Sequence, residues 1–366
     1  MADENSVYKS EAYLAQLLAK AVAAKASDIH LKVGIPPAAR VRGDLVFFKT
    51  EALKDDDTLC IARTVIRDEA VRARLDSLRE HDCAYLAPGV GRFRVNVYRQ
   101  RGSLGIVLRT ISTKIPTLEE LGCPAACQAL AEKERGLVLV VGAAGNGKSS
   151  TLAAMIGHLN RTKPLHIVTV EDPIEFLHAD ERSSVSQREV GIDTDSFANA
   201  LRAALRQDPD VILVGEIRDE LTLDIALKAA ETGHLVFSTV HTVDAARTIN
   251  RLVSVFDAAE QDGVRLRLAE SLRAVISQRL LPRADGQGRV VAVEVMRNTA
   301  TIAECIAVAD KTGEIRDHVA DGRTQYGMQT FDQHLMELFQ REQITLDVAK
   351  GAATSPADFE RNLQFQ

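Results

Sequence analysis

Residues Gly142 to Ser149 read GAAGNGKS and match the pattern G-x-x-x-x-G-K-[ST] in full. An apolar stretch at 137–141 predicts a buried strand before them, and a helical pattern follows. The glycines allow backbone N–H groups to curve around phosphates, next to the positive end of a helix. We expect Lys148 to reach the β- and γ-phosphates and the Ser149 hydroxyl to bind Mg²⁺. The predicted cofactor-binding residues are Gly142, Ala143, Ala144, Gly145, Asn146, Gly147, Lys148, Ser149 and Ser150.

Carboxylates follow two further apolar stretches. DVILVGE ends on Glu216, and an acid at the end of such a strand can hold Mg²⁺ together with Ser149. TVEDPIEF places Glu171, Asp172 and Glu175 after another strand pattern. Clustered carboxylates repel a triphosphate unless they hold a metal ion or a water molecule. One of the three is therefore a candidate general base for an attacking water.

Strand and helix patterns alternate from about residue 136, which predicts a parallel sheet with helices on both faces. Ligands of such sheets bind beyond the carboxyl ends of the strands, where these acids lie. His241 follows the strand pattern of HLVFSTVHT and can touch a γ-phosphate, whereas His234 begins it and is expected to be structural. A last strand at 290–296 and a helical tail from about 299 complete the prediction.

The first 112 residues predict a separate α+β domain. A helix is expected at 11–26, short strands at 27–48, a helix at 53–80, and two strands that turn near Gly102. A linker is expected at 113–118 and the second domain at 119–366. Pro116 restricts the backbone of the linker, which we therefore expect to act as a hinge strap.

Composition narrows the class of protein. The 366 residues carry a net charge of −6, 4% aromatic residues and no Trp, which disfavours nucleic acid as a partner. The acidic start and the short apolar runs predict neither a signal peptide nor a membrane helix. Five scattered cysteines indicate free thiols in a reducing cytoplasm. Cys123 and Cys127 stand four residues apart, and without a second pair or a nearby His we expect no zinc site there.

Four strings in order, GAAGNGKSS, TVEDPIEF, LRQDPDVILVGEIRD and ETGHLVFSTVHT, resemble the Walker A, Asp box, Walker B and His box of the GspE/PilT superfamily of secretion and pilus ATPases. The spacing agrees across about residues 27–283. ASDIHLKVGIPPAARVRGDL resembles the family's N-terminal domain, and YGMQTFDQHLMELF resembles the tail of its retraction branch. The resemblance implies an α/β protein with a PAS-like N-terminal domain, a RecA-like P-loop domain, and ATP and Mg²⁺ as cofactors.

The resemblance also implies roles for single residues. Glu175 matches the water-activating acid, Glu216 the Walker B acid that binds metal with Ser149, and His241 the His-box residue near the γ-phosphate. The family's N-terminal domain supplies arginines to the nucleotide. The candidates for this role in the matching stretch are Arg94, Arg99 and Arg109.

The retraction branch fits best. Assembly and secretion ATPases of the superfamily are usually longer and carry paired CxxC motifs, and this sequence has neither feature. The A-I-R-N-L-I-R-E helix of many retraction ATPases is missing, because the matching region reads NTATIAECIAVADKTGEIRDHVADG. The alternatives are an assembly or type II secretion ATPase, or a low-activity regulatory partner of another pilus motor.

A motor of this branch works as a homohexamer that couples ATP hydrolysis to pilus retraction in twitching motility. The resemblance implies an inner-membrane pilus platform protein as partner and leaves open a sister pilus ATPase. It places the motor in the cytoplasm, at the inner face of the cytoplasmic membrane, in contact with the membrane only through its partners.

Overall fold

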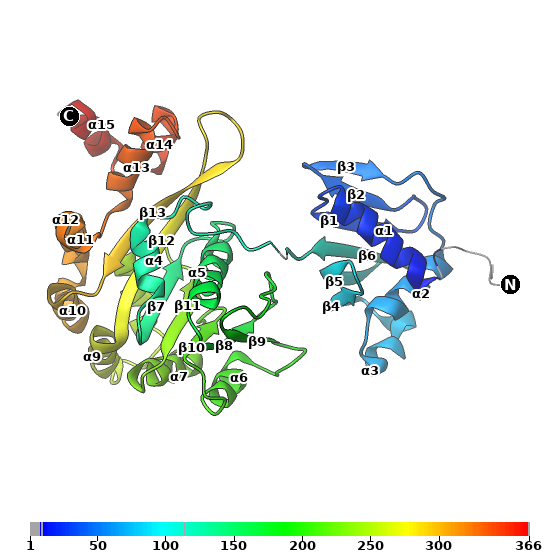
Figure 1. The fold of residues 1–366 in the computed structure, drawn as a ribbon, viewed down its shortest axis with the longest axis horizontal. Coiled ribbons are helices and arrows are strands. Elements are labelled where there is room, and N and C mark those ends of the chain that lie inside the picture. Colours follow the sequence, from blue (N-terminus) through cyan, green and yellow to red (C-terminus); the bar gives the residue numbers. More distant parts are fainter. Residues whose placement is uncertain (1–7, 9, 113, 365–366) are drawn as a thin grey trace. The chain divides into compact units, whose positions relative to one another are not determined.

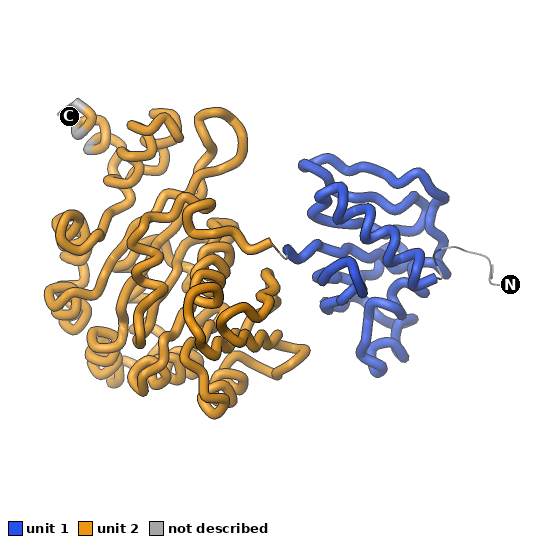
Figure 2. The backbone as a smooth tube through the Cα atoms, in the orientation of Figure 1, with its two compact units in different colours: residues 1–113 blue, residues 114–366 orange. Residues whose placement is uncertain are grey.

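The computed structural model describes residues 8, 10–112 and 114–364. The chain divides into two compact units, residues 1–113 (unit 1) and residues 114–366 (unit 2), which Figure 2 colours separately. Thr113, the first residue of the predicted linker, lies outside the described residues. None of the described helices is both long and apolar enough to cross a bilayer.

Unit 1 is built on a six-stranded antiparallel sheet in the order β3-β2-β1-β6-β5-β4 (Figure 1). Phe93, Val95 and Val97 alternate along β5 and are fully buried in a core that they share with helices α1 and α2. The strands are β1 (Asp28–Lys32), β2 (Ala38–Val41), β3 (Asp44–Phe47), β4 (Glu80–Ala87), β5 (Gly91–Gln100) and β6 (Ser103–Thr110). The helices are α1 (Glu11–Ala23), α2 (Asp55–Val65), α3 (Glu69–Arg72) and the 3₁₀ helix η2 (Leu75–Ser77).

The predicted continuous helix at 53–80 is wrong. Helix α2 ends at Val65, and Ile66 is extended, with φ −86° and ψ 115°. Asp68 then caps α3, because its carboxylate accepts hydrogen bonds from the backbone N–H groups of Ala70 and Val71. Ile66 is fully buried at this break, so core packing outweighs continuation of the helix. Strand β4, which starts at residue 80, was not predicted.

Unit 2 contains a seven-stranded sheet in the order β13-β12-β7-β11-β10-β8-β9. The predicted parallel sheet is confirmed except at its edge, where β13 runs antiparallel to β12. Strands β9 and β12 were not predicted. The apolar pattern of β12 is interrupted by two buried polar residues, Ser277 and Gln278. The strands are β7 (Gly136–Val141), β8 (His166–Glu171), β9 (Ser184–Glu189), β10 (Val211–Val214), β11 (Leu235–Val240), β12 (Leu272–Pro282) and β13 (Arg289–Arg297).

Helices cover both faces of this sheet, as predicted. Leu137, Leu139 and Val141 of β7 share a core with α6 to α10, whereas Val138 and Val140 share the opposite core with α4 and α5. Successive side chains of a strand point to opposite faces, so a strand buried on both sides reads as one apolar run. The helices are α4 (Ala125–Ala131), α5 (Lys148–Thr162), α6 (Phe197–Ala204), α7 (Glu220–Glu231), α8 (Ala245–Val253) and α9 (Gln261–Ser271).

The C-terminal tail is helical, as predicted from about residue 299. Phe331, Leu335 and Leu338 of α13 pack with Leu281 and Val290 on the β12–β13 hairpin, which ties the tail to the sheet (Figure 1). The elements are α10 (Ala300–Ala307), the 3₁₀ helix η3 (Ala309–Glu314), α11 (Ile315–Asp321), α12 (Arg323–Tyr326), α13 (Phe331–Gln340), α14 (Leu346–Ala352) and α15 (Pro356–Gln364).

Candidate nucleotide-binding site

The glycine-rich loop joins β7 to the N-terminus of α5. Gly142 has φ 152°, and a Cβ there would lie 2.6 Å from the carbonyl oxygen of Gln278 on β12, so the position requires glycine. Gly147 caps α5 in the left-handed conformation, with φ 81°. Asn146 Oδ1 accepts a hydrogen bond from the Leu280 N–H at 3.3 Å, which fixes the loop to β12. The loop is therefore shaped before any ligand arrives, at a helix end suited to anions.

The ammonium group of Lys148 lies inside this loop. Lys148 is only 8% exposed, and its Nζ donates to the carbonyl oxygens of Gly142 at 2.9 Å and Ala143 at 3.1 Å. Burial lowers its pKa, and the carboxylates of Glu216 and Glu175 oppose that shift. These two acids therefore lie within electrostatic reach of the lysine, as a site for phosphate and metal requires.

Glu216 follows β10 and lies between a guanidinium group and an imidazole ring. Its Oε1 pairs with the Arg218 guanidinium, and its Oε2 lies 3.4 Å from Nε2 of His241. The second contact lacks hydrogen-bond geometry, so among the described residues the buried Oε2 has no hydrogen-bond partner. A buried carboxylate oxygen without a donor suits a divalent cation, and Ser149 lines the same cavity. The pair Ser149 and Glu216 therefore fits Mg²⁺.

The acids after β8 differ in their surroundings. Glu171 accepts hydrogen bonds from Thr169 Oγ1 at 2.7 Å and from Gln187 Nε2 at 3.0 Å, and burial raises its pKa. Glu175 and Asp172 are exposed and line the cavity. The carboxylate of Glu171 is thus held by side chains of β8 and β9, whereas Glu175 can approach a bound ligand.

One cavity of about 240 Å³ brings the predicted residues of unit 2 together. Its wall contains the lysine of the glycine-rich loop, the pair Ser149 and Glu216, the acids after β8 and the histidine after β11. The remaining predicted loop residues, Gly142, Ala143, Asn146, Gly147 and Ser150, shape the loop without lining this cavity. The predicted residues in the wall are Ala144, Gly145, Lys148, Ser149, Glu171, Asp172, Glu175, Glu216 and His241.

Three further residues belong to the site and were missed. Arg218 pairs with Glu216 and is 68% exposed in its side chain; its place two residues after the Walker B acid was the available signal. His178 lines the cavity, and burial, followed by the charge of Arg161, lowers its pKa to about 4. Thr239 also lines the cavity, and its hydroxyl donates to the Gly215 carbonyl at 2.8 Å.

The arginines of unit 1 are not equivalent. Arg99 donates to the carbonyl oxygens of Leu75, Leu78 and Gly102, so its guanidinium is used within unit 1. Arg109 Nε donates to Asp28 Oδ1 at 2.9 Å. Arg94, opposite Arg109 in the sheet, is exposed and makes no hydrogen bond or ion pair with the part of the chain that the structure describes.

His234 lies at the opposite end of β11 from the cavity. Its Nδ1 is 3.0 Å from the Ala229 carbonyl oxygen and 3.3 Å from the Thr232 hydroxyl. The residue therefore joins the end of α7 to the start of β11, which is a structural role.

The sequence is similar to those of known pilus ATPases. The chain is 45% identical to the type IV pilus retraction ATPase PilT of Pseudomonas aeruginosa over 94% of its own length and 99% of the relative's. It is 42% identical to the type IV pilus ATPase PilU of the same organism, over 91% of this chain and 86% of that protein.

Solved structures are also similar to this chain. The crystal structure of the pilus retraction motor PilT with bound ADP superposes with a TM-score of 0.87 at 44% identity and covers 95% of this chain and 99% of that one. The Legionella pneumophila ATPase DotB gives a TM-score of 0.80 at 30% identity, over 93% of this chain and 95% of that one. The model of the Type II/IV secretion system protein family matches residues 84–363. The chain is an ATPase that uses ATP and Mg²⁺, and it belongs to the Type II/IV secretion system protein family.

Proposed function

We propose that this chain is the ATP-driven motor of type IV pilus retraction. The observation that carries the proposal is one cavity of unit 2, whose wall contains Lys148, Glu216 and the exposed Glu175. The relative that is 45% identical over 99% of its own length is a type IV pilus retraction ATPase, and a further relative from Neisseria gonorrhoeae, 44% identical, is a twitching motility protein.

Each residue has a distinct task in the proposed reaction. Lys148 exchanges its two loop carbonyls for the β- and γ-phosphate oxygens of ATP. Ser149 and Glu216 hold Mg²⁺, which neutralises phosphate charge when bound. Glu175 accepts the proton of the attacking water, and His241 lies beside Glu216, where it can contact the γ-phosphate. Positive charge supplied by an arginine stabilises the transferring phosphoryl group.

Arg94 is the strongest candidate for that arginine. Its side chain is exposed and has no described partner, whereas Arg99 and Arg109 are engaged inside unit 1. A residue of unit 1 can complete the site of unit 2 only where the two kinds of unit meet, within one chain or between neighbours in a ring. We therefore propose a homohexamer, in which the predicted linker at 113–118 allows one unit to rotate as a rigid body against the other.

The proposal places the ring in the cytoplasm against the inner face of the cytoplasmic membrane, on a pilus platform protein. A second candidate function is that of a sister ATPase to another retraction motor, because the chain is also 42% identical to PilU. ATPase activity of the purified chain by itself would support an independent motor. Activity that appears only when a second pilus ATPase is added would support the role of a sister ATPase.

A deletion strain tests the direction of work. Loss of the motor should leave surplus surface pili and abolish twitching. Cells without pili would show that the motor assembles pili instead. Complementation of the deletion strain with Glu175→Gln shows whether ATP hydrolysis is needed. This variant should restore the protein without restoring motility.

A further inference from the structure

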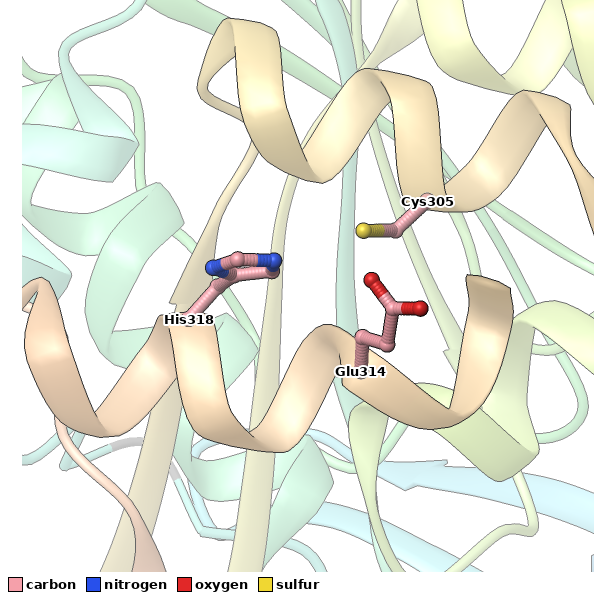
Figure 3. A group of neighbouring side chains, drawn as sticks. All are labelled: Cys305, Glu314 and His318. Atoms are coloured by element: carbon pink, nitrogen blue, oxygen red, sulfur yellow. The ribbon is translucent and has the colours of Figure 1, made fainter.

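A thiol, a carboxylate and an imidazole converge in the C-terminal helical region, away from the nucleotide cavity. Cys305 is on α10, Glu314 ends η3, and His318 is one turn further along on α11. One ligand atom from each lies within 4.8 Å of the others. Figure 3 shows the three side chains directed into the space between the two helices. This region is the one in which the sequence departs from the signature of the retraction branch.

The backbone around the three residues is fixed by other contacts. The buried Arg265 donates to the Ile306 carbonyl at 3.1 Å and to the Thr312 hydroxyl at 3.0 Å. Thr312 in turn donates to the Cys305 carbonyl at 3.3 Å. The segment between α10 and α11 is therefore tied down without help from the three ligand side chains, which is how a pre-organised site is supported.

The side chains themselves have a gradient of exposure. Cys305 is 1% exposed, His318 is half-buried, and Glu314 is exposed. The thiol is thus fixed in the core, and its two partners stand on the solvent side, where they can rotate. Metal–ligand bonds of about 2.0–2.3 Å place tetrahedral ligand atoms about 3.5 Å apart, so small rotations of Glu314 and His318 close the site.

We propose that Cys305, Glu314 and His318 form a zinc-binding site that clamps α10 to α11. Sulfur, imidazole nitrogen and carboxylate oxygen are the three donors that Zn²⁺ takes in proteins, and a water completes four-coordination. Mg²⁺ and Ca²⁺ prefer all-oxygen ligands, so the thiolate selects against the cation that accompanies ATP. The site is separate from the nucleotide cavity, whose wall contains no cysteine.

Occupancy should stabilise the helical region next to α8 and α9. Helix α10 packs against α9, and α11 packs against α8, which follows the His241 loop. A metal that joins α10 to α11 adds cross-links to the hydrogen bonds of Arg265 and Thr312 and to the packing of apolar side chains such as Ile302 and Ile315. A metal that binds only the folded state raises the unfolding temperature.

Cobalt titration of the full chain tests the site. The protein is stripped with a chelator, freed of nucleotide, and titrated with Co²⁺ in place of Zn²⁺. We expect a near-ultraviolet thiolate-to-cobalt charge-transfer band that saturates at about one Co²⁺ per chain and disappears when Zn²⁺ is added. Absence of that band in the wild type overturns the proposal.

Two variants assign the ligands. Cys305→Ser should abolish the band, and His318→Gln, which leaves the buried thiol in place, should weaken Co²⁺ binding at least about tenfold. His158→Gln is the matched control, since His158 Nε2 lies 2.7 Å from a Glu132 oxygen in a pair without a thiol, and it should bind like the wild type. Zn²⁺ should raise the unfolding temperature of the wild type and the control but not of His318→Gln. An unchanged band in both ligand variants overturns the assignment.

Discussion

The Nε2 atom of His241 lies 3.4 Å from Oε2 of Glu216, although 24 residues separate them. The two residues follow β10 and β11, which run parallel and pair from Val211–Leu235 to Val214–Ser238. Parallel pairing brings the carboxyl ends of both strands to one edge. The pairing of these two strands therefore brings Glu216 and His241 together. A ligand bound to the Glu216 carboxylate would lie next to the His241 ring.

Substitutions of the lysine and the acid should separate binding from chemistry. Lys148→Ala removes the charge that faces the phosphates and should weaken ATP binding. Glu175→Gln should keep ATP binding and lose about 10²–10⁴ in hydrolysis rate, because an amide cannot take a proton from water. Nucleotide affinity and steady-state ATPase assays measure the two effects.

Glu171→Gln is the matched control for the base. The Glu171 carboxylate accepts hydrogen bonds from Thr169 of β8 and Gln187 of β9. The variant should therefore lower the stability of the protein more than its ATPase rate. Wild-type turnover in Glu175→Gln together with a loss in Glu171→Gln would assign the base to Glu171 instead.

The arginines of unit 1 should divide by their contacts. Arg94→Ala should lose about 10³–10⁵ in ATPase rate if the guanidinium contacts the γ-phosphate in the ring. Arg99→Ala should leave the rate unchanged but destabilise unit 1 by about 1–3 kcal/mol, because three carbonyl oxygens, two of them in part-buried hydrogen bonds, lose a charged donor. Arg109→Ala should keep the rate as well, since Arg109 pairs with Asp28.

ATPase rates and thermal unfolding of the three variants form the measurement. Normal rates for all three variants would show that the catalytic site lies wholly in unit 2. An inactive but fully stable Arg99→Ala would show that this guanidinium leaves its carbonyls to reach the nucleotide.

Glu294 on β13 should act as a positioning residue for the His241 loop. Its buried carboxylate accepts hydrogen bonds from the Ala245 N–H at 2.9 Å and the Ser277 hydroxyl at 3.0 Å. Burial raises its pKa, and these two hydrogen bonds oppose the rise. Glu294→Ala leaves both donors unpaired, at a cost of about 1–3 kcal/mol each, and frees the start of α8.

We expect Glu294→Ala to lower kcat as well as the unfolding temperature, with little change in ATP affinity. Glu294→Gln keeps an accepting oxygen and should recover most of both properties. A variant that is less stable but has unchanged kcat would limit Glu294 to a structural role.

His334 should make stability depend on pH. Burial lowers its pKa from 6.5 to about 4, opposed by the charge of Glu337, and its Nδ1 accepts the Val293 N–H at 2.9 Å. The unfolded chain takes up this proton at a higher pH than the folded chain. The contribution of His334 is therefore fully present above about pH 6.5 and is lost as the pH falls through 4.

Between pH 7 and pH 5 this one group should cost about 2 kcal/mol of unfolding free energy. Urea unfolding at several pH values gives the slope of unfolding free energy against pH. This slope is compared between the wild type and His334→Gln, which lacks the titrating ring. His178 shifts in the same direction and should account for part of the slope that remains in the variant. Equal slopes for both proteins would contradict the assignment.

Much of the nucleotide site could be predicted from sequence because its parts are local. The phosphate loop is a contiguous string whose glycines adopt conformations that other residues avoid, such as φ 152° at Gly142. Strands buried on both faces read as apolar runs, so β7, β8, β10 and β11 and the acids after them could be located without a structure.

Tertiary structure decided what depends on contacts between distant residues. The break at Ile66, strand β12 with its buried Gln278, and the antiparallel edge at β13 follow from packing, which local patterns do not encode. The same holds for the choice among arginines, since only the fold shows that carbonyls of unit 1 occupy Arg99. It holds as well for the cluster of Cys305, Glu314 and His318, whose ligand spacing matches no short motif because a turn between two helices brings the side chains together.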